Sequence, residues 1–108
     1  MALQVLELSF QVVEQLRPLM QRIRQRDRSL TDQIVRAASS VALNIAEADH
    51  SDPGNQRARF FTASGSASET LAGLRLAVGW GHVPADETEA PAELLRRIVA
   101  MLWKLTRR

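Results

Sequence analysis

Few residues in this 108-residue chain have the types and spacing that catalysis or metal binding requires. The most suggestive string is Glu47-Ala48-Asp49-His50, a Glu-x-x-His pattern of the kind that supplies metal ligands in di-iron helical bundles. Those sites need a second copy and further inward-facing carboxylates, but the other histidine, His82, has glycine three residues before it. We therefore predict no metal site and expect His50 at a helix end or in a loop.

Motifs for nucleophilic catalysis and phosphate binding are also missing. The chain has no cysteine, which excludes thiolate nucleophiles, thiolate metal sites and disulfides. The glycine patterns of phosphate-binding loops and dinucleotide folds do not occur. Gly65-Ser66-Ala67 falls inside a predicted helix, whereas a nucleophile elbow needs a strand-to-helix turn. The sequence therefore predicts a protein that is not an enzyme and that uses no cofactor.

Four large or polar residues have structural interpretations instead. Asn44 and Glu69 both adjoin apolar positions, and we interpret them as a hydrogen-bonded pair that fixes the register of two helices. We interpret Trp80 and Trp103 as core or interface anchors rather than as platforms for stacked bases.

Four amphipathic helices would position these residues. Apolar residues recur at spacings of three, four and seven, and no segment has the alternation of a strand. The four segments span about residues 3–26, 30–49, 55–78 and 87–106. Pro18 lies inside the first pattern, which resumes beyond it and so predicts one kinked helix. Short connections favour an all-α fold, an antiparallel up-down-up-down four-helix bundle that forms a single domain over residues 1–108.

Local signals predict helix ends and one close contact. Ser29 or Thr31 is expected to cap the second helix, and Pro91 falls in the first turn of the fourth, where proline is tolerated. Gly65 lies in a run of small residues inside the third helix. Glycine there costs about 1 kcal/mol relative to alanine, so we expect the close approach of a neighbouring backbone to compensate.

The chain carries no predicted membrane or export signal. No apolar run approaches the roughly 20 residues that span a bilayer. The first residues, Met1-Ala2-Leu3-Gln4-Val5-Leu6-Glu7, lack the basic start and cleavage site of a signal peptide. We expect a cytoplasmic protein without a membrane partner.

The expected topology separates the charges into two groups, although the net charge is only +2. Near-neutral charge is expected at the end that joins Arg22, Arg24, Arg26 and Arg28 with Asp86, Glu87, Glu89 and Glu93. The other end combines the start of the third helix with the end of the fourth. Its basic candidates are Arg57, Arg59, Arg96, Arg97, Lys104, Arg107 and Arg108, partly offset by Glu47, Asp49 and Asp52.

The basic group has two interpretations that the sequence leaves open. It is either a polyanion-binding patch or a solvated surface in which basic residues match the dipole at a helix end. No helix-turn-helix or zinc finger accompanies it. Any nucleic-acid binding would therefore be led by phosphate contacts, with little sequence preference.

Two motifs resemble a known family. The stretch Ser29-Leu-Thr-Asp-Gln-Ile34, followed by Arg36-Ala-Ala38 and Asn44-Ile-Ala-Glu47, resembles the second helix of the intervening-sequence proteins. Phe61, Gly65-Ser-Ala67, Glu69 and Leu71 resemble their third helix. These bacterial four-helix bundle proteins are encoded within inserts in some large-subunit ribosomal RNA genes. The family includes the accessory variability protein of diversity-generating retroelements.

The resemblance implies a ring-like homopentamer without known catalytic activity. For the retroelement branch it also implies a basic surface that binds nucleic acid, RNA or DNA, and a reverse transcriptase as protein partner. The residues that match family positions are Asp32, Gln33, Arg36, Asn44, Glu47, Gly65, Ser66 and Glu69. We interpret them as determinants of packing and assembly. The family usually has glycine where this chain has Ala48, so the second helix is expected to end differently.

Two functions follow as hypotheses. The first is a non-enzymatic homo-oligomeric scaffold that binds RNA, or a complex of RNA and protein, through the basic end of the fourth helix. The second is a protein-interaction module that binds no nucleic acid, in which the arginines only keep the surface solvated.

Overall fold

Apolar residues at three- and four-residue spacings meet in one core between four long helices. The computed structural model describes residues 2–107. Its helices are α1 (Ala2–Arg24), α2 (Arg28–Ala48), α3 (Pro53–Gly79) and α4 (Glu89–Thr106), with a 3-10 turn η1 (Ala85–Thr88) before α4. The largest fully buried side chains include Ile23, Ile34, Ile45 and Ile98, which contribute to the core from α1, α2 and α4.

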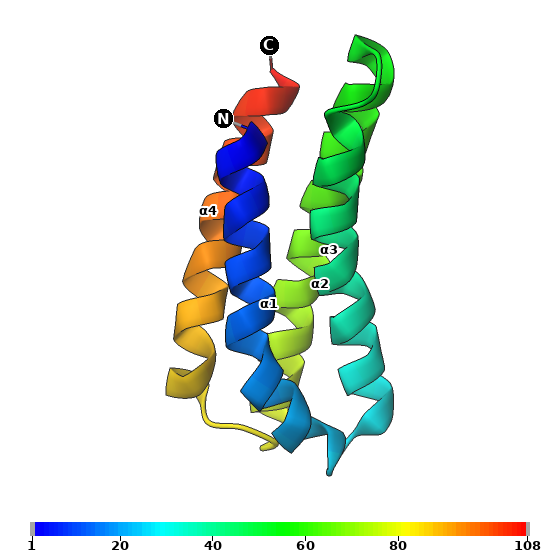
Figure 1. The fold of residues 1–108 in the computed structure, drawn as a ribbon. Helices are drawn as coiled ribbons and strands as arrows, with labels where there is room; N and C mark the ends of the chain where they lie inside the picture. Colours follow the sequence, from blue (N-terminus) through cyan, green and yellow to red (C-terminus); the bar gives the residue numbers. More distant parts are fainter. Residues whose placement is uncertain (1, 108) are drawn as a thin grey trace.

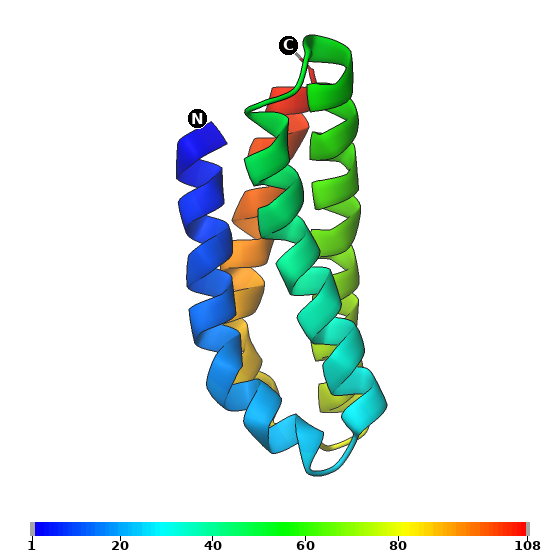
Figure 2. The same ribbon diagram turned by 45° about the vertical axis from the view of Figure 1, so that its right-hand side comes forward.

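The helices alternate in direction around the core (Figures 1 and 2). Each helix packs against its two neighbours around the core: α1 packs against α2 and α4, and α3 packs against α2 and α4. Both termini and the α2–α3 connection lie at one end of the bundle, and the other two connections lie at the opposite end (Figure 1). The structure thus confirms the predicted antiparallel four-helix bundle. No helix within residues 2–107 combines the length and apolar character needed to cross a bilayer.

The observed helix bounds are close to the predicted ones, and α1 continues through Pro18 as one helix. The predicted cap of α2 was wrong. Asp27, rather than Ser29 or Thr31, caps this helix, because its side chain accepts a hydrogen bond of 3.0 Å from the Leu30 N–H. Asp52 caps α3 in the same way through the Asn55 N–H.

The predicted close contact at Gly65 was also wrong. A Cβ built on Gly65 would meet nothing within 4 Å, whereas one built on Gly73 would lie 2.6 Å from Cγ1 of Ile34. The close approach of α2 and α3 is therefore centred two turns further along α3. Gly81 has the positive φ of 77° in the loop that ends α3, a conformation that favours glycine.

Candidate nucleic-acid interface

Arg57, Lys104 and Arg107 lie at one end of the bundle, and Arg97 adds a cation nearer the middle of α4. Arg57 lies near the start of α3, and Lys104 and Arg107 lie at the end of α4, with Arg97 two turns earlier. All four are exposed. None of them forms an ion pair with another residue in the described part of the chain. We use "the basic end" for these four residues below.

Aromatic rings, rather than carboxylates, contact two of these cations. The guanidinium carbon of Arg107 lies 4.3 Å from the centroid of the Trp103 ring. That of Arg57 lies 5.8 Å from the centroid of the Phe61 ring. A cation over an aromatic face is attracted by the ring quadrupole and keeps N–H groups that can still donate to a phosphate. The basic end therefore combines uncompensated positive charge with exposed aromatic surface.

Two of the predicted basic candidates are neutralised within the chain. Nη1 of Arg59 lies 2.7 Å from a carboxylate oxygen of Glu47. Nη2 of Arg96 lies 3.2 Å from Glu93 and 3.7 Å from Glu89. The Arg59–Glu47 pair depends on the register between α2 and α3 and was not predictable, whereas the i, i+3 spacing of Glu93 and Arg96 within α4 was a signal that the sequence analysis missed. Arg108 lies outside the described residues.

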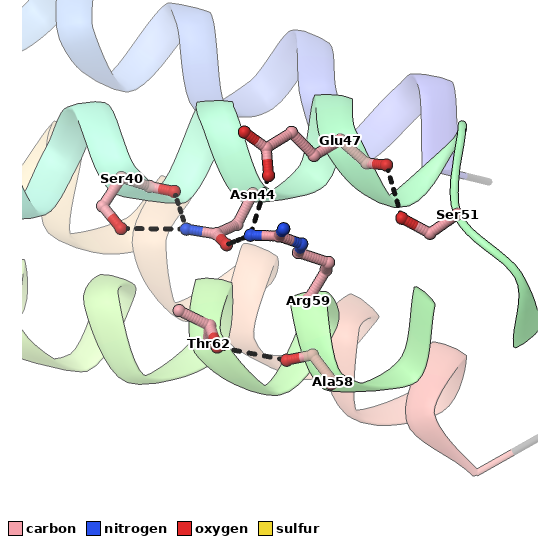
Figure 3. A network of polar contacts seen from close by, with 7 residues as sticks. All are labelled: Ser40, Asn44, Glu47, Ser51, Ala58, Arg59 and Thr62. Atoms are coloured by element: carbon pink, nitrogen blue, oxygen red, sulfur yellow. Dashed lines mark hydrogen bonds and ion pairs between the residues drawn. The ribbon is translucent and has the colours of Figure 1, made fainter. Parts of the chain in front are cut away.

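Arg59 belongs to a polar network between α2 and α3 (Figure 3). It donates to Oδ1 of Asn44 at 3.5 Å, while the Asn44 amide donates to the carbonyl and hydroxyl oxygens of Ser40 at 2.9 and 3.0 Å. The Ser40 hydroxyl in turn lies 2.8 Å from that of Ser66 on α3. This network, rather than the predicted Asn44–Glu69 pair, links the two helices in register.

The other residues that match family positions differ in their exposure and in their contacts. Glu69 is exposed and lines a small hollow of about 90 Å³ together with Gln33. Asp32 pairs with Arg24 at 3.2 Å across the α1–α2 turn. Arg36 and Gly65 are exposed. Asn44 and Ser66 contact side chains between α2 and α3, whereas Asp32 and Glu47 form exposed ion pairs, and the role of these residues in assembly stays a prediction.

The opposite end of the bundle is held by charge pairs. Arg22 contacts Glu87 at 2.6 Å, as the topology predicted. His82 Nε2 lies 3.2 Å from Oδ2 of Asp27, which joins the α3–α4 loop to the α1–α2 turn. The hydrogen bond from the Leu30 N–H, with a smaller contribution from His82, holds the pKa of Asp27 below its ordinary value of 3.8. Asp27 is therefore a charged cap at neutral pH.

Neither tryptophan is a core anchor. The Trp80 residue is 72% exposed and the Trp103 residue 56% exposed. Phe61 and Trp103 were not among the predicted site residues. Phe61 lies four residues from Arg57, and Trp103 lies four residues from Arg107, a spacing that brings two side chains together on a helix. That spacing was the signal from which the aromatic part of the basic end could have been found.

The Glu-x-x-His string forms no metal site. His50 is exposed beyond the end of α2, and Glu47 pairs with Arg59. Within residues 2–107 no three histidine or acidic side chains gather closely enough to hold a metal ion.

A groove between α1 and α2 is a second surface feature that the sequence did not predict. Its volume is about 760 Å³, and its apolar lining includes Leu16, Met20 and Ala38. Small residues on the α1-facing side of α2, such as Ala38, leave this space unfilled. Arg17 and Arg28 also line it.

The comparisons with known proteins agree with this fold. The chain is similar to a solved structure of a protein with unknown function from the S23 ribosomal protein family of Bacteroides thetaiotaomicron VPI-5482. The TM-score is 0.90 at 20% sequence identity, over 96% of this chain and 99% of the other. None of the curated proteins matches the sequence.

The family itself is identified by a match along almost the whole chain. The family model described as 23S rRNA-intervening sequence protein matches residues 1–104. Neither that description nor the description of the similar structure names a catalytic activity. The chain belongs to the family of 23S rRNA-intervening sequence proteins.

Proposed function

We propose that the protein is a non-enzymatic homo-oligomeric scaffold that binds nucleic acid, RNA in the first place, through the basic end. The observation that carries the proposal is that cations without a carboxylate partner gather with two exposed aromatic rings at one end of the bundle. Arg17, Arg26 and Arg28 also form no ion pair within residues 2–107, but no aromatic ring of the described chain lies against them. Arg22, Arg59 and Arg96 are each held by a carboxylate. Arg57, Lys104 and Arg107 gather at one end of the bundle without such a partner among residues 2–107. Uncompensated cations can neutralise phosphates and release counterions, which drives binding.

Exposed apolar residues on two separate helices support self-assembly. Leu3, Phe10 and Val13 follow one another at spacings of seven and three along α1, and all three are exposed. Leu76 on α3 and Trp80 directly after it are also exposed, and α3 is the helix diagonal to α1. We call these the α1 face and the α3 face. A ring requires two different faces that complement each other, because its interfaces are heterologous.

Charge reversal at the basic end tests the nucleic-acid function. In the variant Arg57→Glu/Lys104→Glu/Arg107→Glu, retention on an RNA column should be lost while the far-ultraviolet circular dichroism spectrum is unchanged, because all three side chains are exposed. The matched control is Arg17→Glu/Arg26→Glu/Arg28→Glu, which makes the same charge change on exposed arginines elsewhere and should still bind. Equal retention by the two variants would contradict the proposal.

Salt provides a second criterion. If the three cations contact phosphates of a single strand, log K should fall with log salt at a slope of about −2, from roughly −0.7 for each contact. A flat response to salt would contradict phosphate-led binding.

The groove between α1 and α2 favours a second candidate function, the docking of an acidic amphipathic helix from a partner protein. Leu16, Met20 and Ala38 would accept its apolar side, and Arg17 and Arg28 would attract carboxylates at its edge. This candidate needs no nucleic acid.

A designed helical peptide with leucines on one face and glutamates beside them tests this second candidate. Val35→Glu places a carboxylate in the groove lining and should abolish shifts in the protein's amide NMR spectrum when the peptide is added. Gln33→Glu, on the same helix but outside the groove, should not. If a peptide with lysine in place of glutamate binds equally well, the charge-complementary docking is wrong.

A further inference from the structure

Trp103 is an exposed indole beside Lys104 and Arg107 of the basic end. It follows Leu102 and precedes Lys104, and its own side chain lies outside the core while Leu102 and Leu105 are buried. The residue is 56% exposed, which leaves a large apolar ring in contact with solvent. Trp103 follows Arg96 by two helical turns, so both side chains leave α4 on the same side, the side where Arg96 and Leu71 of α3 line one hollow.

Arg107 gives this indole a cationic neighbour of fixed geometry. Its guanidinium carbon lies 4.3 Å from the ring centroid, so the planar cation rests against the ring. Arg107 directly follows α4 and lies four residues after Trp103, a spacing that brings two side chains together at the end of a helix. A guanidinium in this position can donate to a phosphate while the remaining ring surface stays available.

Phe61 provides a second ring of the same kind. It is 57% exposed, and the Arg57 guanidinium lies 5.8 Å from its centroid. Leu71 of α3 and Arg96 of α4 line one hollow. Toward the same end of the bundle, Phe61 lies ten residues from Leu71 along α3, and Trp103 lies seven residues from Arg96 along α4. At 1.5 Å per residue these are advances of about 15 and 10 Å, so the two rings lie at similar levels, within about one helical turn.

We infer that the nucleic acid bound at the basic end is single-stranded and that one of its bases stacks on Trp103, with Arg107 and Lys104 on the adjoining phosphates. The inference rests on the proposed function and specifies its ligand. Duplexes cover their base faces by internal stacking, whereas unpaired nucleotides present them to aromatic side chains. A surface that served only phosphates would gain nothing from an exposed indole. RNA and DNA single strands share the stacking chemistry, and the experiment separates them.

Trp80 supplies a matched control within the same chain. It is also exposed, but it lies at the opposite end of the bundle, where α3 ends. No arginine in the described chain lies over its ring. Each tryptophan can therefore be removed separately, and the fluorescence of the other then reports on one end of the bundle.

The test measures binding of an oligouridine of about 20 nucleotides, longer than the roughly 4–16 nucleotides that single-strand-binding domains cover. Trp103→Leu should weaken its affinity between about 5-fold and 150-fold, the range observed for loss of one stacked base. Leu43→Ala removes another exposed apolar side chain from α2, the helix diagonal to α4 and outside both apolar faces, and should bind like the unaltered protein. In the Trp80→Phe variant, oligouridine should quench the emission of Trp103, and in the Trp103→Phe variant it should leave Trp80 emission unchanged.

The binding of three nucleic acids is compared: oligouridine, oligothymidine of the same length, and an RNA duplex. Tighter binding of both single strands than of the duplex, with the preference lost in Trp103→Leu, supports the inference. Preference for oligouridine over oligothymidine would add that the 2′-hydroxyl or the base without the 5-methyl group contributes. If the protein binds all three equally and Trp103→Leu changes nothing, stacking is wrong while the proposed function stands. If the unaltered protein binds none of them, the proposed function itself fails.

Discussion

Gly73 of α3 lies directly against Ile34 of α2, so closely that a Cβ on the glycine would be 2.6 Å from Cγ1 of the isoleucine. Ile34 is buried and β-branched, so its side chain has little freedom to move aside. Absence of a side chain at position 73 is therefore what lets α2 and α3 approach. This contact sets the distance between the two helices that carry the motifs of the family.

The two glycines inside α3 should respond oppositely to alanine. Gly73→Ala should destabilise the protein by about 1–2 kcal/mol, because overpacking against Ile34 outweighs the gain in helix propensity. Gly65→Ala should stabilise it by up to about 1 kcal/mol, since a Cβ there meets nothing within 4 Å. Urea unfolding followed by circular dichroism measures both. A Gly73→Ala protein as stable as the unaltered one would show that α2 and α3 can separate at no cost.

The hydroxyl pair between Ser40 and Ser66 should be energetically coupled. The two oxygens are 2.8 Å apart and partly buried, so either substitution removes this hydrogen bond. Ser40→Ala leaves the Ser66 hydroxyl without this partner, whereas in Ser66→Ala the Ser40 hydroxyl still accepts from Asn44. Ser40→Ala and Ser66→Ala should each cost about 1 kcal/mol, and the double variant should cost less than their sum. The exposed Glu47–Arg59 pair serves as the comparison and should show a coupling below about 1 kcal/mol. Additive effects for the serines would indicate that they do not interact in solution.

Stability should fall in acid through the two helix caps. Hydrogen bonds from the N–H groups of Leu30 and Asn55 hold the pKa values of Asp27 and Asp52 below 3.8. The folded protein therefore takes up these protons less readily than the unfolded chain. The stabilisation is complete above the unfolded pKa and is lost as pH falls from about 4 through the folded values.

Asparagine substitution checks the assignment of the acid transition to Asp27. Asp27→Asn keeps an oxygen that can cap α2 but removes the titrating group. The melting temperature of this variant should lie below that of the unaltered protein at pH 7 and should change less between pH 5 and pH 3. An unchanged acid dependence would assign the transition to other carboxylates.

Assembly should depend on both the α1 face and the α3 face. Phe10→Glu and Trp80→Glu should each reduce the oligomer to smaller species, since each places a charge in an apolar face. Gln11→Glu, at the neighbouring exposed position of α1, is the control and should leave the mass unchanged. Mixing the two face variants should give a one-to-one dimer, because each chain keeps the face that the other has lost. If the mixture stays monomeric by sedimentation, the faces do not form a heterologous pair.

The topology and most helix bounds were predictable because each depends on residues within one helix. The repeat of Val5, Leu8 and Val12 marks the buried side of α1 without knowledge of its neighbours. Short connections then fix the up-down order. The family was also predictable, since Asn44-Ile-Ala-Glu47 and Gly65-Ser-Ala67 are contiguous strings.

Contacts between helices were not predictable, because they depend on register. The small residues around Gly65 indicated a close approach there, but the approach occurs at Gly73, which the hydrophobic pattern does not distinguish. Asn44 was expected to meet Glu69 and instead meets Ser40 and Arg59. The same uncertainty placed Arg59 among the phosphate-binding candidates, although Glu47 already holds it. Arg96 was a different case, because its partner Glu93 lies three residues away in the same helix and could have been recognised from the sequence.

Light-scattering mass after size exclusion, measured with and without bulk RNA at low and moderate salt, tests the scaffold most directly. With a chain mass of 12.0 kDa, the protein alone should elute as a homo-oligomer close to five chains, and RNA should co-elute with it at low salt and separate at moderate salt. A monomer that elutes independently of RNA at both salt concentrations would contradict both the assembly and the nucleic-acid function.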